Sequence, residues 1–379
     1  MLSHRLRLAA GVSVAAVVLV SGIATAGAKN GARTSSSGVA AAQAQLKAAE
    51  KVPVFKAPGP AFDASKAKGK TIFEIPVASY LPAIANTSKA MVAVGKKIGV
   101  NVIDYPNQGE PSQWAQGVEE AISRHANLIV LQSGADPKVL APQIAAAKKA
   151  GIPVLVVHQY TASDSIPADV NLSVPAPFVK AAQLLADEAI TATKGKANVL
   201  FVGDAAYQSN VDMVKVVKQQ LAKYCSGCKL TYKSVPVATW ATKIQSTVQT
   251  ALLADPTINF VIPCFDAEQE WAIPGIIAAG ARGRVQSASY NGDPAVIKDI
   301  ISGNIARATV GESSDWLGYA YMDEALRMLT GAPVIHNLQT PVRVFDSTNA
   351  KQAGSPPQWN TGYGNSYVSG YMRLWGLAK

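Results

Sequence analysis

The feature that most constrains the fold of this chain is a regular alternation of short strand patterns with longer helical patterns. Apolar runs rich in β-branched residues, each bounded by Gly, Pro or Asn, indicate buried strands at residues 72–77, 100–105, 128–131 and 154–157. Helical patterns lie between them at residues 87–98, 111–124 and 137–150. This βαβα order predicts a parallel sheet that helices cover on both faces.

The same order begins again after residues 171–175. A helical pattern with Phe178 on its apolar face comes first. Strand patterns follow at residues 199–202, 230–237, 259–262, 285–289 and 306–310, and a last helix is indicated at 315–329. We therefore predict an α/β protein with two doubly wound parallel-sheet lobes. A single (β/α)₈ barrel is the alternative, but the chain breaks near residue 173 without a helix and residues 356–379 are rich in Gly and Tyr.

Residues 1–28 have the order of a secretory signal peptide. Arg5 and Arg7 precede an uncharged stretch at residues 8–28, whose apolar centre is followed by the small-residue pattern Ala24-Thr25-Ala26. An uncleaved membrane anchor is the alternative, because this stretch is just long enough to span a bilayer. Both interpretations predict export to the periplasm or cell envelope. Residues 29–70, rich in Ala, Lys, Ser, Gly and Pro, are expected to form a low-complexity tether with one short helix at 40–50.

The net charge of +10 does not indicate a nucleic-acid partner. The first 49 residues carry five of the 35 basic residues and no acidic residue. The rest of the chain therefore has a charge of +5, spread without a basic run.

Motifs for catalysis, cofactors and metals are missing from the sequence. It contains no G-x-S-x-G, H-E-x-x-H or G-x-G-x-x-G pattern, and three Cys and four His leave few ligands for a metal. We expect no enzyme activity, no cofactor and no metal. Cys225 and Cys228 follow a helical pattern, where the helix dipole opposes a reactive thiolate, so a structural disulfide is favoured over a redox motif. Cys264 is expected to be a buried thiol.

Polar and aromatic residues gather where the predicted strands end. In open parallel sheets, ligands bind beyond the carboxyl ends of the strands. Aromatic rings can stack on the C–H face of a sugar while carboxylates and amides accept its hydroxyls. The candidate ligand-binding residues are Tyr80, Gln132, His158, Gln159, Tyr207, Gln208, Trp240, Asp266, Tyr290, Asn291, Glu312 and Trp316. No Arg is among them, so a neutral, hydroxyl-rich ligand is expected, with a cationic one as the alternative.

The sequence resembles the type I periplasmic binding proteins, close to the ribose- and galactose-binding group. The residues that carry the resemblance are 129–133, 150–154, 265–266, 289–292 and 305–311. The resemblance implies three crossovers, near residues 171–174, 311–314 and 345–350. Lobe 1 would then contain residues 71–172 and 313–345, and lobe 2 would contain residues 173–312 and 346–379. Gln132, His158, Asp266 and Asn291 stand at sugar-contacting positions of the family, although most identities differ.

The resemblance implies a solute-binding protein of an ABC importer. We expect a sugar or polyol to bind between the lobes of a monomer, which then delivers it to a membrane permease. A sensing module of the same fold coupled to a receptor, or a protein that binds a different small molecule, is the alternative. A repressor would need a helix-turn-helix before the first strand, where this chain has the leader and the tether.

Overall fold

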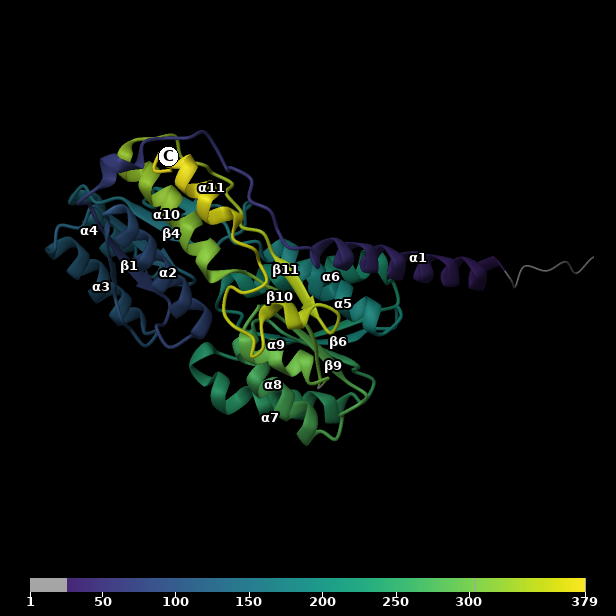
Figure 1. Ribbon diagram of the computed structural model, residues 1–379. Coiled ribbons are helices and arrows are strands. Elements are labelled where there is room, and N and C mark those ends of the chain that lie inside the picture. Colours follow the sequence, from purple (N-terminus) through teal and green to yellow (C-terminus); the bar gives the residue numbers. More distant parts are fainter. Residues whose placement is uncertain (1–25, 304, 379) are drawn as a thin grey trace, which may run out of the picture.

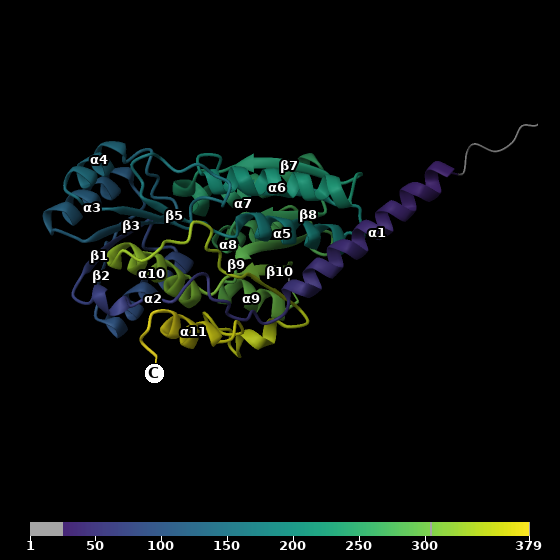
Figure 2. The ribbon, with the colours of Figure 1, turned by 90° about the horizontal axis from the view of Figure 1, so that it is seen from above.

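The computed structural model describes residues 26–303 and 305–378, and these form two α/β lobes side by side (Figures 1 and 2). The predicted fold class is confirmed. Most of the predicted leader lies outside the described residues. Within the described part of the chain, no helix is long and apolar enough to cross a membrane.

Lobe 1 is built on a five-stranded parallel sheet in the order β2-β1-β3-β4-β5. Its strands are β1 (Thr71–Pro76), β2 (Asn101–Asp104), β3 (Leu128–Gln132), β4 (Val154–Val157) and β5 (Leu172–Val174). Helices α3 (Pro111–Ser123) and α4 (Ala141–Lys149) cover one face, and α2 (Pro82–Ile98) with α10 (Ser314–Thr330) covers the other. Successive strand residues point to opposite faces, so Ile129 and Leu131 pack under α3 and α4 while Leu128 and Val130 pack under α2 and α10.

Lobe 2 is built on a six-stranded sheet in the order β11-β10-β9-β8-β6-β7. Its strands are β6 (Asn198–Gly203), β7 (Lys229–Ser234), β8 (Phe260–Pro263), β9 (Gln286–Asn291), β10 (Ala306–Gly311) and the antiparallel β11 (Arg343–Asp346). One face packs against α5 (Phe178–Ala192) and α6 (Gln208–Tyr224). The other packs against α7 (Trp240–Ala254), α8 (Asp266–Ala278), α9 (Pro294–Ile301) and the 3-10 helices η2 (Val237–Thr239) and η3 (Ala350–Ala353).

Several helices begin where the sequence places a proline. Pro82, Pro111 and Pro294 stand in the first turns of α2, α3 and α9. A proline is tolerated there because the first amide groups of a helix have no partner within it. Each of these helices follows a strand directly, so its N-terminus lies at the edge of the sheet where the strand ends.

The first two predicted crossovers lie close to those of the structure. The chain leaves lobe 1 after β5, and it returns from lobe 2 between β10 and α10. The third, predicted at residues 345–350, was misplaced, because β11 already pairs with β10 in the lobe 2 sheet. The chain therefore crosses before Arg343.

The C-terminal segment does not stay in lobe 2 as predicted. After Tyr363, which packs in the lobe 2 core, α11 (Ser366–Leu374) packs on α10 of lobe 1. Tyr367, Tyr371 and Trp375 stack against Trp316 and Tyr319 of α10. The large aromatic surface that this packing buries explains why the segment joins lobe 1.

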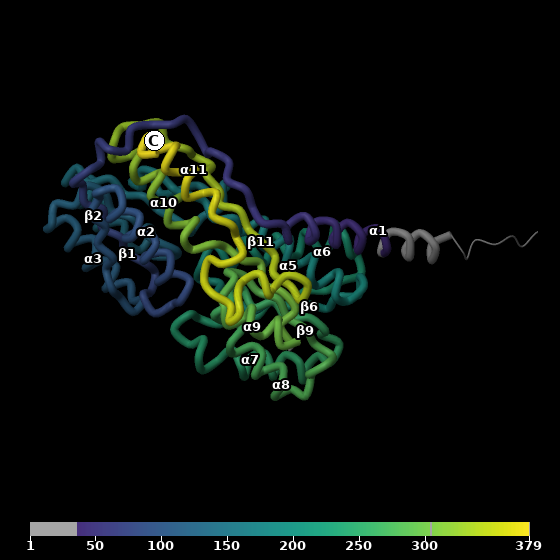
Figure 3. Tube along the Cα trace, in the orientation of Figure 1, coloured from purple at the N-terminus to yellow at the C-terminus, as the bar shows by residue number. Residues whose placement is uncertain are grey.

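Residues 38–70 lie against the two lobes, so the prediction of a tether was wrong for this part of the chain. The predicted short helix is longer, since α1 spans Ala26–Ala49, and its residues Ala42 and Leu46 are buried against α5 and α6. Residues 50–62, which we call the strap, then run to lobe 1 beside the C-terminal segment (Figure 3). Phe55 of the strap contacts Tyr371 edge to face, at 4.8 Å between ring centroids. The 3-10 helix η1 (Ala64–Ala67) completes this layer.

A disulfide joins Cys225 and Cys228 at the turn between α6 and β7, and Cys264 is a buried free thiol. Burial raises the pKa of the Cys264 thiol well above its ordinary value, and the nearby Glu268 adds to the effect. Such a thiol is unreactive at neutral pH.

Candidate ligand-binding site

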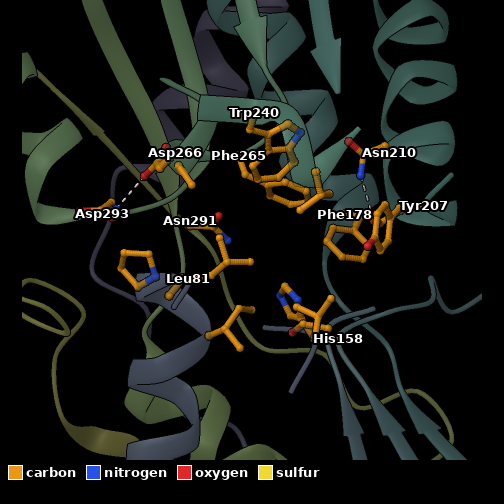
Figure 4. Close-up of a pocket in the computed structure, with 18 residues that line it drawn as sticks. Leu81, His158, Phe178, Tyr207, Asn210, Trp240, Phe265, Asp266, Asn291 and Asp293 are labelled. Carbon is orange, nitrogen blue, oxygen red and sulfur yellow. Dashed lines mark hydrogen bonds between the residues drawn. The ribbon is translucent and has the colours of Figure 1, made fainter. Parts of the chain in front are cut away.

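A cavity lies between the lobes, where the carboxyl ends of both sheets face each other. Its empty volume is about 740 Å³, and we call it the main cavity. Loops after β1, β3 and β4 of lobe 1 and after β6, β8 and β9 of lobe 2 surround it. In each lobe this is the point where the strand order reverses, which is the usual ligand position in open α/β sheets. Figure 4 shows the residues that line it.

Two further spaces adjoin the main cavity, and the outer one is the more open and the larger of the two. An outer cleft, lined by Tyr80, Gln159, Tyr207 and Gln208 among others, opens beside it. An inner recess next to the hinge is lined by Ser133, His158, Asn291 and Glu312 among others. His158 borders all three spaces.

Lobe 2 contributes an aromatic wall to the main cavity. Phe178, Trp240 and Phe265 lie together on one side, with Leu81 of lobe 1 opposite them (Figure 4). Phe178 contacts Phe265 edge to face, at 6.5 Å between ring centroids. The indole Nε1 of Trp240 donates to the carbonyl of Val235 at 3.0 Å, so this side chain offers the cavity only its ring carbons.

The hinge side of the cavity is built around His158 and Glu312. The imidazole Nε2 lies 3.0 Å from Oε1 of Glu312, and both side chains are buried. Tyr290 is stacked on His158 at 6.4 Å, and Phe178 meets the imidazole edge to face at 5.1 Å. Because Glu312 lies on the second crossover and His158 ends a lobe 1 strand, this pair ties the cleft to the hinge.

Three of the lining residues have positive φ although they are not glycine: Ser133 (59°), His158 (56°) and Asn291 (140°). Such a backbone is costly for residues with a side chain and is enriched at functional sites. Each of the three stands at the carboxyl end of a strand, where the chain turns into the cleft.

Asp266 lines the main cavity, but its oxygens already have partners. Oδ1 accepts from Ser289 Oγ at 2.5 Å, Oδ2 accepts from the amide of Asp293 at 2.7 Å, and Thr309 Oγ1 lies within 3.0 Å of both. Burial raises the pKa of Asp266 to about 7, and these hydrogen bonds only partly offset the shift. These hydrogen bonds hold the β9 and β10 strand ends together, and the predicted contact of Asp266 with ligand stays a prediction.

This raised pKa predicts a pH dependence of stability. Between the ordinary Asp pKa near 4 and the folded-state pKa of about 7, the folded protein binds the proton more tightly than the unfolded chain. The contribution of Asp266 to the free energy of unfolding is therefore greatest in mild acid and falls as the pH rises toward 7. The unfolding free energy of the unchanged protein should therefore fall between pH 5 and pH 8. In Asp266→Asn we expect this fall to be smaller by about 1–3 kcal/mol, measured by urea unfolding. An equal pH dependence in both proteins would contradict the assignment.

The structure brings most of the predicted site residues together. His158, Tyr207, Trp240, Asp266 and Asn291 line the main cavity. Tyr80, Gln159 and Gln208 line the outer cleft, and Glu312 lines the inner recess.

Gln132, Tyr290 and Trp316 line none of these three spaces. The Gln132 side chain turns to Ser88 of α2, whose Oγ lies 3.2 Å from Oε1. Tyr290 is buried behind His158. The prediction that Trp316 faces ligand fails because the turn of α10 directs it to Tyr367 at 4.7 Å, while Leu317 and Tyr321 of the same helix face the inner recess.

Sequence reasoning did not select several lining residues. Phe178 was assigned to the apolar face of a helix, and its position at the first turn of α5 places it at the cavity. Leu81 and Ile84 lie at the beginning of α2, directly after β1. A position just after a predicted strand is the only signal that could have indicated them.

Among the residues that the structure describes, no Arg or Lys lines the main cavity, the outer cleft or the inner recess. Glu110, Asp136 and Asp204 border the outer cleft. Within residues 26–303 and 305–378, no cluster of three or more His, Cys, Asp or Glu side chains could hold a metal ion. An anionic ligand would find no Arg or Lys partner among the described residues that line these spaces.

The family model for the periplasmic binding protein domain matches residues 79–333, and the chain belongs to this family. No match to this chain was found among curated proteins.

Solved structures of similar fold include two ABC transporter solute-binding proteins and a carbohydrate transporter. One is an ABC transporter solute-binding protein from Agrobacterium vitis with bound α-D-tagatopyranose. It is 18% identical, with a TM-score of 0.69, and the match covers 76% of this chain and 99% of that protein. Another, from Mycobacterium smegmatis with bound glycerol, has 18% identity, TM-score 0.68 and coverages of 77% and 98%. A carbohydrate transporter protein from Acidothermus cellulolyticus, in complex with myo-inositol, has 19% identity, TM-score 0.64 and coverages of 76% and 97%.

Proposed function

We propose that this protein is an exported solute-binding component of an ABC importer. It captures a small neutral sugar or polyol in the main cavity and delivers it to a membrane permease. The observation that carries the proposal is an interlobe cavity at the strand ends, with an aromatic wall and no Arg or Lys among its described lining residues. The sugars and polyols named for proteins of similar fold support this ligand class.

The proposed mechanism is closure of the two lobes on the solute. Residues from both lobes line the cavity, so a ligand that bridges Leu81 and Ile84 on one side and Phe178 and Phe265 on the other favours the closed arrangement. The crossovers at the hinge take up the rotation. The Glu312 crossover carries the contact to His158, which places a cleft residue directly on the moving segment.

The test is to screen neutral sugars and polyols by thermal shift, confirm a ligand by calorimetry and then measure X-ray scattering. A ligand at about 100 times its dissociation constant should stabilise the native state by about 2.7 kcal/mol. We expect the radius of gyration to decrease when this ligand is added.

Asn291→Gly tests the contribution of a single cavity side chain. Glycine accepts the positive φ of this position, so the backbone is kept while the side-chain amide is lost. It should bind about 10- to 100-fold more weakly and stay open at the same ligand concentration. Tight binding without compaction would refute closure, and selective binding of an anionic solute would refute the ligand class.

A further inference from the structure

The polar side chains of the main cavity differ in how much hydrogen-bonding capacity they have left for a ligand. Asp266 is saturated by Ser289, Thr309 and Asp293, and Trp240 donates its only N–H to Val235. Asn210 accepts the amide hydrogen of Asp204 at its Oδ1. These side chains border the cavity, but most of their hydrogen-bonding groups already have partners within the protein.

Three of the groups that remain available lie together at the hinge side, while Tyr207, Ser209 and Asp293 line the main cavity but not the inner recess. Ser133 and His158 follow the neighbouring strands β3 and β4, and Asn291 ends β9. All three line both the main cavity and the inner recess, which places them at the boundary between the two spaces. Among the described residues, no side-chain hydrogen bond is formed by Ser133 or Asn291, and His158 uses only Nε2, toward Glu312 and Tyr290. A hydroxyl, an amide and one imidazole nitrogen are thus free on one side of the cavity.

Most of the remaining cavity wall is hydrocarbon. Leu81 and Ile84 come from lobe 1, and Phe178, Val237 and Phe265 come from lobe 2. Figure 4 shows Phe265 and Phe178 on one side and Leu81 on the other, with Asn291 between them. A ligand hydroxyl pressed against these walls would lose its water partners and gain none from the protein, which weakens binding. A methyl or methylene group at the same place would gain from burial.

We infer that the preferred ligand is a neutral ring compound whose hydroxyl groups lie along one edge and whose opposite edge is hydrocarbon, as in a deoxy sugar or a partly deoxygenated cyclitol. This inference rests on the proposed function and narrows its ligand class. The hydroxylated edge faces Ser133, His158 and Asn291, and the hydrocarbon edge lies between the aromatic wall and α2.

Matched pairs of probes test the inference by calorimetry on the exported protein. The pairs are L-rhamnose with L-mannose, L-fucose with L-galactose, and cis-1,2-cyclohexanediol with myo-inositol. In each pair, the first member lacks hydroxyls that the second carries. We expect at least one deoxygenated member to bind at least tenfold more tightly than its partner, and no pair to show the reverse order. Equal or tighter binding of the fully hydroxylated members would overturn the inference and leave the proposed function standing. Failure of all six probes would also overturn it, and binding of charged solutes alone would overturn the proposed function as well.

A variant of the hydrocarbon wall provides the second test. Ile84→Thr keeps a β-branched side chain, removes the terminal methyl group and adds a hydroxyl to the wall of the main cavity. We expect it to reduce the preference for the deoxygenated member at least threefold. Val92→Thr is the matched control, because Val92 is exposed on the same helix and lines none of the three spaces. An unchanged preference in Ile84→Thr would contradict the assignment of the wall, whatever the absolute affinities.

Discussion

Replacing Arg327 by alanine is expected to lower the free energy of unfolding by about 3–5 kcal/mol. Arg327 on α10 is fully buried, and its Nε donates to Asp323 Oδ2 at 2.9 Å. Its other nitrogens donate to the carbonyls of Pro60 in the strap and Pro333, and the guanidinium lies 4.4 Å from the centre of the Phe62 ring. Without it, Asp323 would be a buried carboxylate that has lost its cationic partner, and the strap would lose its anchor.

Arg124→Ala is the control for this prediction. Arg124 pairs with Glu120 at 2.6 Å on the surface of α3, and both side chains are exposed. Exposed pairs contribute little, so its removal should change the unfolding free energy by less than about 1 kcal/mol. Urea unfolding of the two variants gives the comparison. Similar small losses in both would show that the Arg327 network does not stabilise the fold.

Phe178→Ala is expected to cost about 3–5 kcal/mol of unfolding free energy and to weaken the binding of any ligand that calorimetry identifies. The Phe178 ring is 1% exposed and contacts His158, Phe265 and Tyr290. Its loss leaves a hole between the lobe 2 core and the aromatic wall of the main cavity. The enlarged cavity no longer fits the ligand, so affinity should fall at least tenfold.

Val179→Ala tests whether these effects are specific to the wall. Val179 is the next residue of α5, and it is 40% exposed. We expect little change in stability and none in affinity. Phe178→Leu keeps the site occupied by a smaller apolar group, so a folded variant remains for the binding measurement. Normal affinity in both Phe178 variants would show that this ring does not contact ligand.

The lobes could be predicted from sequence because their strands are buried on both faces. Runs such as residues 154–157 contain only apolar β-branched or aliphatic residues, and this composition in a short segment is typical of a strand inside a parallel sheet. The third crossover was misplaced because β11 is a short antiparallel edge strand of four residues, with Arg343 and Asp346 at its ends. Neither its length nor its composition distinguishes it from a loop.

The N-terminal and C-terminal segments escaped prediction for a different reason. In α1 the buried contacts come from small residues such as Ala42, so the apolar periodicity is weak against a background rich in Ala. In α11, Tyr367 and Tyr371 stand four residues apart, with Trp375 four residues further. That spacing is a helical signal, but the surrounding glycines obscured it.

The candidate site was predictable as a region and much less as individual contacts. Strand ends identified His158 and Asn291 because the carboxyl edge of a parallel sheet is defined by topology. Whether a side chain at that edge has free hydrogen-bonding groups depends on tertiary partners far away in sequence. Asp266 shows this clearly, since its partners Ser289 and Thr309 are 23 and 43 residues away.

The contribution of α11 to lobe 1 has a consequence for how the chain is made. The first strand of this lobe begins at Thr71, yet its core includes Trp375, whose indole Nε1 donates to the buried Asp323 at 2.7 Å. While the ribosome is still synthesising the chain, lobe 1 therefore lacks a layer of its core, and its apolar surface cannot be closed. Completion of this core waits until Trp375 has emerged. The helix α11 therefore determines when folding of lobe 1 can finish.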